Sequence, residues 1–285
     1  MKINKVTKQR KQYPAYLLEI SSVPKQLFYL GEPPEAYLPA VTIVGSRKLS
    51  PYGREVTYQL AYDLAKQGVS VISGLALGAD GVAHQAAIDA GGRTIAVLAN
   101  GLDEIYPASH RNLAIEILKK GGTIMSEYPT GTPSLKHHFI ARNRIVSGLS
   151  DMVIITEAAE ASGSLVTANF ALEQNKLVGA VPGNITNPLS IGTNTLIKSG
   201  AQLITSAQDV LNALGIQAEE KVRQEVFGDT AEEQAIIDLM KQGITEMDQL
   251  QQQSNLDPAI FSQTLTMLEI SGKIRPLGAA HWTLN

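Results

Sequence analysis

The chain has 285 residues, no cysteine and a formal net charge of −3 at pH 7. This length is enough for one large and one small domain, neither of which needs disulfides. No apolar run reaches the roughly 18 residues of a membrane span, and the start of the chain lacks the apolar core of a signal peptide. We therefore expect a cytoplasmic protein with no membrane partner.

Residues 1–40 form a lead-in whose start is strongly basic. Five cations precede the first acidic residue: Lys2, Lys5, Lys8, Arg10 and Lys11. A run of this kind is usually a solvated arm, so we expect no binding site in it.

From residue 41 to residue 215, short runs rich in Val and Ile alternate with helical patterns. This alternation is typical of buried parallel strands joined by crossover helices. The expected strands are residues 42–44, 69–72, 94–98, 123–125, 152–156, 178–181 and 202–204. The expected helices are residues 52–66, 81–90, 110–119, 141–149, 164–174 and 193–199. We predict an α/β fold with a doubly wound, mostly parallel sheet.

Clusters of glycine and small polar residues follow six of the expected strands, and ligands of such sheets bind at the carboxyl ends of the strands. The clusters are residues 45–47, 73–78, 99–101, 126–128, 162–164 and 182–184. Glycine allows close backbone approach to a phosphate, and free N–H groups at a helix start favour an anion. Turns and helix caps need the same residue types, but convergence of six clusters on one rim favours binding.

A triplet, Arg142-Asn143-Arg144, follows Lys136 and Phe139 and lies in the expected helix at residues 141–149. Guanidinium groups beside a ring suit a single-stranded nucleic acid, because its charge lies on phosphates and its bases stack on aromatic faces. The same residues also occur as solvated surface ion pairs, with the ring packed under the loop. Arg47, Lys136 and Arg144 on the glycine-rich rim favour the binding interpretation.

A series of ordered motifs runs through this part of the chain. They are VTIVGSR at 41–47, SGLA at 73–76 with Gly78 and Asp80, SEYP at 126–129, RNRI at 142–145 and SGSL at 162–165. Over about residues 13–214 the series resembles the DNA-processing protein A (DprA, or Smf) family. The resemblance implies an extended Rossmann-like domain that binds single-stranded DNA, protects incoming DNA, forms dimers and helps load the RecA recombinase during natural transformation. It implies neither turnover nor a cofactor.

Carried over to matching positions, the resemblance and the rim give one set of expected DNA-binding residues. They are Gly45, Ser46, Arg47, Gly78, Lys136, Phe139, Arg142, Asn143, Arg144, Gly163 and Ser164. Two departures from the family pattern stand beside them. About forty residues precede the first expected strand, too few for the helical module of many members, and Ile140 stands where the family often has proline.

Other interpretations remain open. Related Rossmann-like folds hydrolyse nucleoside monophosphates or bind nucleotides, but residues 162–165 lack the paired glycines of such hydrolases and residues 45–47 are no dinucleotide fingerprint. Asp80 and His84 lie one helical turn apart, as metal ligands do, yet no third ligand has a recognisable spacing, so a capping Asp and a helix His are preferred. We expect Glu127 and Glu157 to be partners of the arginines rather than general acids or bases.

Residues 216–229 form a linker of mixed charge, and residues 230–285 a second domain. Three helices are expected at 232–241, 247–253 and 258–271, with Thr245 and Asp257 as caps, followed by a hairpin at 274–284 around Gly278. Three helices and a hairpin describe a winged helix.

The charge of this domain opposes a role in DNA binding. Residues 1–215 carry 19 basic and 16 acidic residues, a net of +3, whereas residues 216–285 carry 5 and 11, a net of −6. The third helix offers Gln263 and Thr264 but no cation before Lys273. Since phosphate contacts supply most non-specific affinity, we expect this domain to contact a protein.

Overall fold

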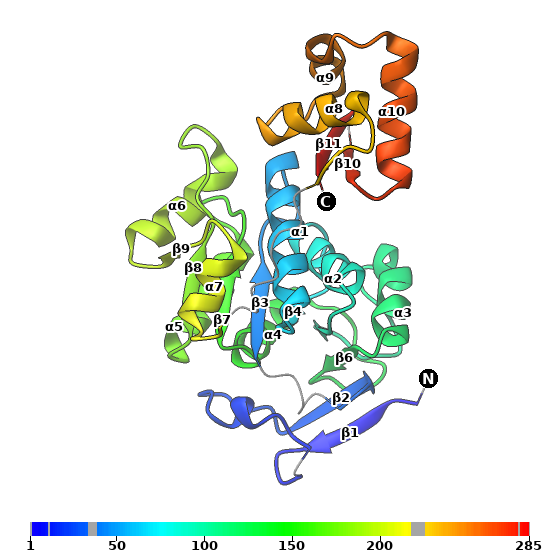
Figure 1. The fold of residues 1–285 in the computed structure, drawn as a ribbon. Helices are drawn as coiled ribbons and strands as arrows, with labels where there is room; N and C mark the ends of the chain where they lie inside the picture. The colour runs from blue at the N-terminus through cyan, green and yellow to red at the C-terminus, as the bar shows by residue number, and fades with distance from the viewer. Residues whose placement is uncertain (1, 11, 34–38, 218–225, 279, 285) are drawn as a thin grey trace. The chain divides into compact units, whose positions relative to one another are not determined.

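The computed structural model describes the chain except residues 1, 11, 34–38, 218–225, 279 and 285. Contacts divide it into two compact units, Met1–Glu219 and Glu220–Asn285 (Figure 1). The second unit begins within the expected linker, most of which lies outside the described residues.

The N-terminal unit is built on a sheet that has nine strands among the described residues, in the order β1-β2-β6-β5-β4-β3-β7-β8-β9. Neighbouring strands from β6 to β9 in this order are parallel, whereas β1 and β2 pair antiparallel at one edge. The strands are β1 (Asn4–Thr7), β2 (Gln26–Gly31), β3 (Ala40–Val44), β4 (Ser70–Ser73), β5 (Thr94–Leu98), β6 (Thr123–Ser126), β7 (Met152–Ile155), β8 (Leu177–Ala180) and β9 (Gln202–Leu203).

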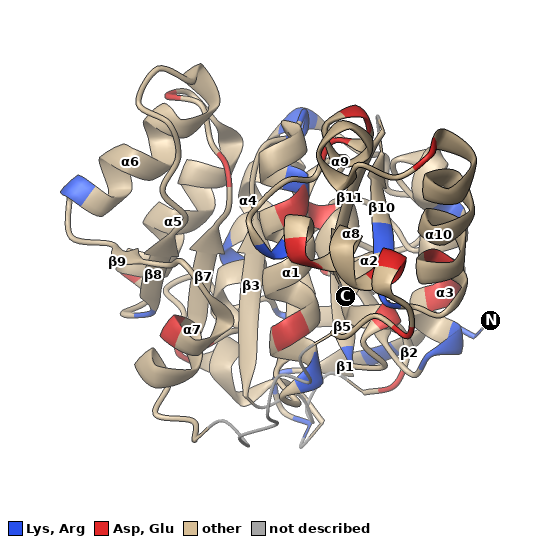
Figure 2. Cartoon of the chain, turned by 45° about the horizontal axis from the view of Figure 1, so that its top comes forward, with Lys and Arg blue, Asp and Glu red and all other residues tan. Residues whose placement is uncertain are grey.

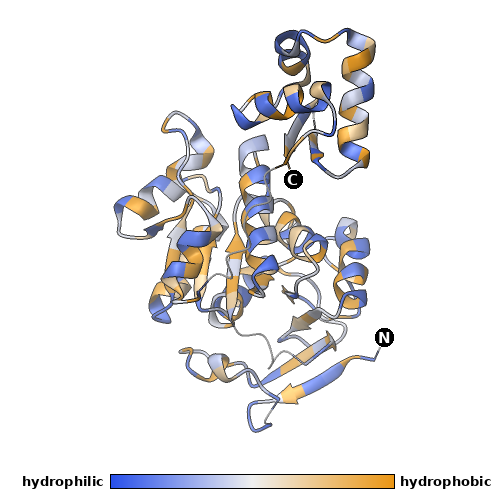
Figure 3. Cartoon of the chain, in the orientation of Figure 1, coloured by the Kyte–Doolittle hydropathy of each residue, from blue (hydrophilic) through white to orange (hydrophobic). Residues whose placement is uncertain are grey.

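Helices cover both faces of this sheet, so strands β3 to β7 are buried throughout and read as continuous apolar runs (Figure 3). Helices α1, α2, α3 and α7 pack on one face, and α4, α5 and α6 on the other. Their bounds are α1 (Pro51–Lys66), α2 (Ala79–Asp89), α3 (Arg111–Lys119), α4 (Lys136–Gly148), α5 (Gly163–Glu173), α6 (Ile191–Lys198) and α7 (Ala207–Ala213). The doubly wound α/β prediction is confirmed.

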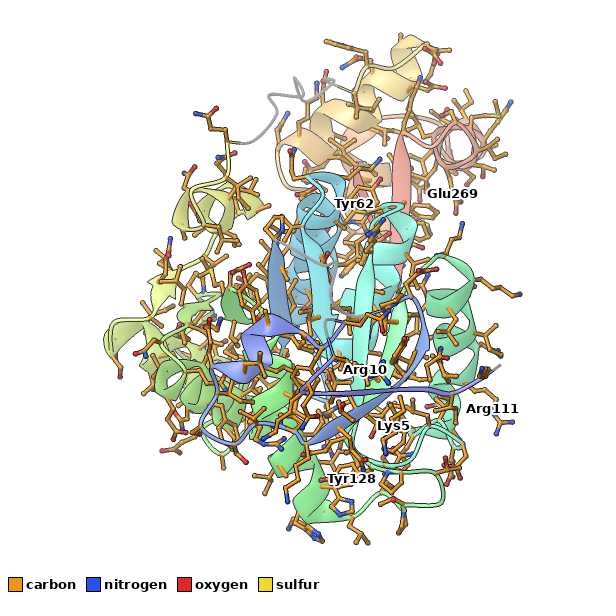
Figure 4. All side chains as sticks on the ribbon, turned by 90° about the horizontal axis from the view of Figure 1, so that it is seen from below. Lys5, Arg10, Tyr62, Arg111, Tyr128 and Glu269 are labelled. Atoms are coloured by element: carbon orange, nitrogen blue, oxygen red, sulfur yellow. The ribbon has the colours of Figure 1, made fainter. Side chains whose placement is uncertain are left out.

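The lead-in is part of the sheet, so the solvated-arm interpretation is wrong for its backbone. Strand β1 pairs with β2, and β2 pairs with β6 through partners such as Phe28 and Ser126. Leu17 and Leu27 are fully buried in the core. The cations Lys5 and Arg10 remain exposed (Figure 4). The free energy gained by burying the apolar residues of this segment holds its backbone in the sheet, while its basic side chains stay in solvent.

Two helices differ from the sequence expectation. Helix α4 begins at Lys136, five residues before the expected start, and α7 was not expected. Leu135 provides no side-chain cap for α4, so the usual N-terminal signal is missing there. The Ser206 capping box does mark the start of α7, because Ser206 and Asp209 bond each other's backbone N–H groups.

The C-terminal unit has its own core, formed around Phe261, Ile236 and Leu268. Its elements are α8 (Ala231–Lys241), α9 (Met247–Ser254), α10 (Pro258–Ile270), β10 (Ile274–Gly278) and β11 (His281–Leu284), and the two strands pair antiparallel. Asp257 caps α10 as expected, but Glu246 rather than Thr245 precedes α9. The winged-helix prediction is confirmed. Within the described parts of the chain, no helix is both long and apolar enough to cross a bilayer.

Candidate nucleic-acid interface

A groove of about 800 Å³ opens at the carboxyl ends of the parallel strands. Strand β3 lies between β4 and β7 in the sheet, so the chain leaves β3 and β7 in opposite directions. This is the switch point at which open α/β sheets leave a crevice for ligands. The groove is lined by the loop after β3, the loop after β7 and the first turns of α4 and α5.

The loop Gly45-Ser46-Arg47 forms one side of the groove and is fixed by its backbone. The Ser46 N–H donates to the Glu157 carbonyl at 2.7 Å, and the Ala79 N–H donates to the Ser46 carbonyl at 3.1 Å. A Cβ at Gly45 would lie 2.9 Å from both the Thr156 hydroxyl and the Ala79 side chain. The close packing therefore excludes a larger residue at Gly45.

Gly78 supports this loop from behind and does not line the groove. Its φ of +78° is in the left-handed region, and a Cβ there would lie 2.2 Å from the Ser46 carbonyl oxygen. Gly78 therefore allows the loop after β4 to pack closely against the loop after β3.

An aromatic cluster lies over the groove and brings together Arg47, Phe139 and Tyr106. The Arg47 guanidinium carbon is 5.5 Å from the centroid of the Phe139 ring, and the centroids of the Tyr106 and Phe139 rings are also 5.5 Å apart. Lys136 lies one helical turn before Phe139 and is exposed. Cations and rings are therefore within reach of the same ligand.

Tyr106 was not among the expected site residues, although its ring is 45% exposed at the groove. It lies in the loop after β5. The sequence shows an aromatic residue in a rim loop, but it does not show whether such a ring faces a ligand or packs in the core.

The start of α5 forms the opposite side of the groove. Ser162 caps this helix by accepting from the Ser164 N–H at 3.3 Å, and the two hydroxyls lie 2.7 Å apart. Nothing lies within 4 Å of a Cβ built at Gly163, so the backbone there faces open space. The first turns of α4 and α5 both present their N-termini to the groove, which favours an anion.

Arg142 is only 4% exposed and holds the rim together from inside. Its Nη1 donates to the carbonyls of Gly74 and Val97, where β4 and β5 end. Asp80 is buried nearby and accepts from the N–H groups of Gly74 and Ala76 at 3.0 and 3.2 Å. Burial lowers the pKa of Arg142 to about 10 and raises that of Asp80, while their mutual attraction opposes both shifts.

The three residues of the Arg-Asn-Arg triplet point in three directions, so they form no continuous strip of guanidinium groups. Arg142 is buried at the inner wall of the groove, Asn143 lines the groove nearer to solvent, and Arg144 forms an ion pair with Glu127 at 2.7 Å. Successive helical residues are rotated by about 100°, which separates neighbours in sequence onto different faces.

The expectation for Glu127 is confirmed by this ion pair, but the one for Glu157 is wrong. Glu157 is 2% exposed, and its carboxylate accepts from the N–H and hydroxyl of Ser50 at 2.9 and 2.5 Å. Ser50 is the N-cap of α1. Glu157 thus ties the end of β7 to the start of α1 rather than to an arginine.

Asp80 and His84 face different groups. The Nδ1 atom of His84 is 2.7 Å from the Thr94 hydroxyl, and burial lowers the His84 pKa to about 3. Across the described ranges, no group of three or more His, Asp or Glu side chains is placed to hold a metal ion.

The chain is similar in sequence to known proteins. The chain is 47% identical over 202 residues to protein Smf of Escherichia coli, which covers 71% of this chain and 54% of Smf. It is 42% identical over 213 residues to the DNA processing protein DprA of Bacillus subtilis, covering 74% of this chain and 71% of that protein. The chain therefore spans about half of the Escherichia coli relative.

Two solved structures are similar. The DNA processing protein A of Streptococcus pneumoniae has a TM-score of 0.70 and 42% identity, over 74% of each chain. That of Helicobacter pylori, described for its single-stranded DNA binding mode, has a TM-score of 0.67 and 34% identity, over 75% of this chain and 96% of its own. Residues 221–279 match the DprA winged helix domain, and residues 4–215 match the DNA recombination-mediator protein A family. This chain belongs to that DprA family.

Proposed function

We propose that the groove binds single-stranded DNA without sequence preference. The protein then acts as a recombination mediator, which protects incoming DNA and helps load RecA during natural transformation, without turnover or a cofactor. Support comes from membership of the recombination-mediator family and from the single-stranded DNA binding of the Helicobacter pylori relative.

The observation that carries this proposal is the cluster of Arg47, Phe139 and Tyr106 over the groove. A duplex hides the faces of its bases, whereas a single strand offers them to aromatic rings. Phosphates of the same strand are then within reach of Arg47, Lys136 and the two helix N-termini. In a single strand, charged phosphates alternate with flat bases, and these match the cations and the aromatic rings of the groove.

The expected site residues divide into contacts and supports. Arg47, Lys136 and Asn143 are proposed to contact phosphate or sugar, Phe139 to stack on a base, and the backbone or hydroxyl groups of Gly45, Ser46, Gly163 and Ser164 to bond phosphate oxygens. Gly78, Arg142 and Arg144 are proposed to hold the loops that carry these groups.

The test is a titration of labelled single-stranded and duplex oligonucleotides at several salt concentrations, with Arg47→Ala and Lys136→Ala. Each variant is expected to bind the single strand more weakly, with a salt slope lower by about 0.7 per lost phosphate contact. Lys48→Ala is the control, since Lys48 is exposed beside Arg47 but does not line the groove. Equal affinity for duplex, or an unchanged Arg47→Ala, contradicts the proposal, and release of free base from nucleoside monophosphates indicates an enzyme instead.

We also propose that the N-terminal unit forms a homodimer, because the family resemblance locates self-association there. Light scattering on residues 1–219 is expected to give the mass of a dimer at micromolar concentration. A monomer under these conditions contradicts it.

A further inference from the structure

A second aromatic cluster lies beside the groove and is not used by the proposed function. Tyr128, in the loop after β6, stacks on His138 with ring centroids 4.1 Å apart and an interplanar angle of 27°. His137 meets the edge of His138 at 4.4 Å and 73°. None of the three rings lines the groove.

Hydrogen bonds position the His138 ring and the backbone of Tyr128. The Nδ1 atom of His138 lies 3.2 Å from the Pro133 carbonyl oxygen. The Tyr128 N–H donates to the Ser126 hydroxyl at 3.1 Å, at the end of β6. His137 is nevertheless exposed, and Tyr128 and His138 are only partly covered. The cluster therefore presents stacked aromatic surface to solvent.

The surroundings of this cluster favour an anionic ligand. Lys136, His137 and His138 occupy the first turn of α4, which has no acidic residue and no side-chain cap. Basic groups at a helix N-terminus oppose the helix dipole, so this arrangement does not help the helix form. Local sequence choices that conflict with stability are typical of functional surfaces.

The two aromatic clusters flank the first turn of α4. Strands β5 and β6 are parallel neighbours, with Leu98 beside Ser126, so the loops that carry Tyr106 and Tyr128 leave the same edge of the sheet. Tyr106 contacts Phe139, and Tyr128 contacts the preceding residue, His138. A strand that leaves the groove past Lys136 thus meets a second set of rings.

We propose that Tyr128, His137 and His138 form a second stacking platform for single-stranded DNA, which holds bases beyond those bound at Phe139. This inference rests on the proposed function and extends it to a longer footprint. Lys136 lines the groove and directly precedes His137 at the start of α4, so it is placed to supply a phosphate contact to the nucleotides that join the two sets of rings.

The first experiment measures affinity for oligothymidines of about 4 to about 16 nucleotides, the range of site sizes typical of such grooves. Tyr128→Ala and the double variant His137→Ala with His138→Ala are expected to lose about five-fold or more in affinity for the longest oligonucleotides, which corresponds to at least about 1 kcal/mol per stacked base. Affinity for the shortest, which fill only the groove, stays unchanged. Equal affinity of wild type and variants at every length overturns the proposal.

A matched control is available on another part of the unit. Tyr62 stacks on Tyr58 of α1 at 6.0 Å, with Lys66 5.3 Å from its ring centroid, and so has similar neighbours (Figure 4). Tyr62 and Tyr128 lie far apart in that view. Tyr62→Ala is expected to bind every length as the wild type does, and a loss equal to that of Tyr128→Ala overturns the proposal.

Conservative variants and cross-linking separate stacking from folding. Tyr128→Phe and His138→Phe keep a ring and are expected to keep the affinity for long oligonucleotides, whereas a loss equal to that of alanine overturns the proposal. Wild-type protein irradiated with iodouracil-substituted single strands should cross-link at residue 128, 137 or 138, and cross-links confined to groove residues overturn it. If Arg47→Ala weakens binding while Tyr128→Ala does not, the proposed function is supported and the second platform is overturned. If the protein binds no single-stranded DNA at all, both proposals are overturned.

Discussion

The rim of the N-terminal unit and helix α10 of the C-terminal unit are both places where DNA-binding folds make contacts, yet they differ in charge. The rim presents Arg47 and Lys136 to solvent beside aromatic rings. Helix α10 carries Glu269 and no Lys or Arg (Figure 2). Its outward residues include Met267 and Ile270, the latter 74% exposed.

This difference teaches that a winged-helix fold alone does not indicate DNA binding. Non-specific affinity depends on cations that replace counterions at phosphates. Lys273, just after α10, is held by Asp229 at 2.6 Å and Glu233 at 2.8 Å. Residues 216–285 carry a net charge of −6, and we therefore propose that the C-terminal unit contacts a protein rather than DNA.

The largest expected effect separates the stabilities of the two units. Arg142→Met leaves the buried carbonyls of Gly74 and Val97 without their donor and removes the positive charge near buried Asp80, and should cost about 3–5 kcal/mol of unfolding free energy in the N-terminal unit. The single Trp, Trp282, reports only on the C-terminal unit. In the variant, the unfolding transition followed by far-ultraviolet circular dichroism should therefore have its midpoint at a lower denaturant concentration than in the wild type. The midpoint followed by Trp fluorescence should stay the same. Arg111→Met, at an exposed site on α3, is the control, and equal midpoints for both arginine variants contradict the prediction.

Two cation–ring pairs test the comparison directly. Phe139→Ala should weaken single-strand binding by about 1–3 kcal/mol with little change in salt slope, because stacking releases few counterions. Phe227 has Lys241 at 5.0 Å from its ring and forms the corresponding pair in the C-terminal unit. Phe227→Ala is expected to leave fluorescence-anisotropy titrations with single strands unchanged. Equal losses of single-strand affinity in the two variants would contradict the prediction that only the N-terminal unit binds the strand.

The pH dependence of stability should also differ between the units. Burial lowers the folded pKa of His84 to about 3 from its ordinary value of 6.5, so below pH 6.5 the unfolded state binds a proton that the folded state does not. Stability is then lost as pH falls, by about 2 kcal/mol at pH 5, since each pH unit corresponds to about 1.36 kcal/mol. His84→Gln should show a flatter decline by circular dichroism between pH 7 and pH 5. Parallel curves for wild type and variant contradict the assignment.

The smallest expected effect is that of removing residues 220–285. Single-strand affinity should change by less than about 0.5 kcal/mol, the usual size of an effect away from a site. The isolated C-terminal unit should show no micromolar binding to duplex DNA at physiological salt. Loss of most of the single-strand affinity, or duplex binding by the isolated unit, would make the winged helix a second nucleic-acid site.

The parallel strands and the rim were predictable because their signals are local. Buried parallel strands are continuous apolar runs, and their loops are marked by Gly and Ser. The strand at residues 94–98, for example, is found at the same bounds in the structure. The chain order then brings the loops to one edge.

The direction of side chains and long-range pairing were not predictable in this way. Sequence places Arg142 and Arg144 together, but the helix turns one into the core and the other toward Glu127. Strand β2 joins the main sheet by pairing with β6, and no pattern within residues 26–31 indicates such a distant partner. Tyr106 and Tyr128 become notable only once α4 is known to begin at Lys136.

The place of β2 in the sheet also sets an order of events during synthesis. Strand β2 can pair with β1 as soon as both are made, but Phe28 pairs with Ser126, so its other edge waits for β6 until much of the unit has emerged from the ribosome. Contacts between residues far apart in the chain form slowly, because loop closure costs entropy before they are made. Until then the nascent segment carries Leu17 and Leu27 without their core. Lys5, Lys8 and Arg10 precede these leucines and are exposed, and charges that flank an apolar segment generally oppose its aggregation while it is unpaired.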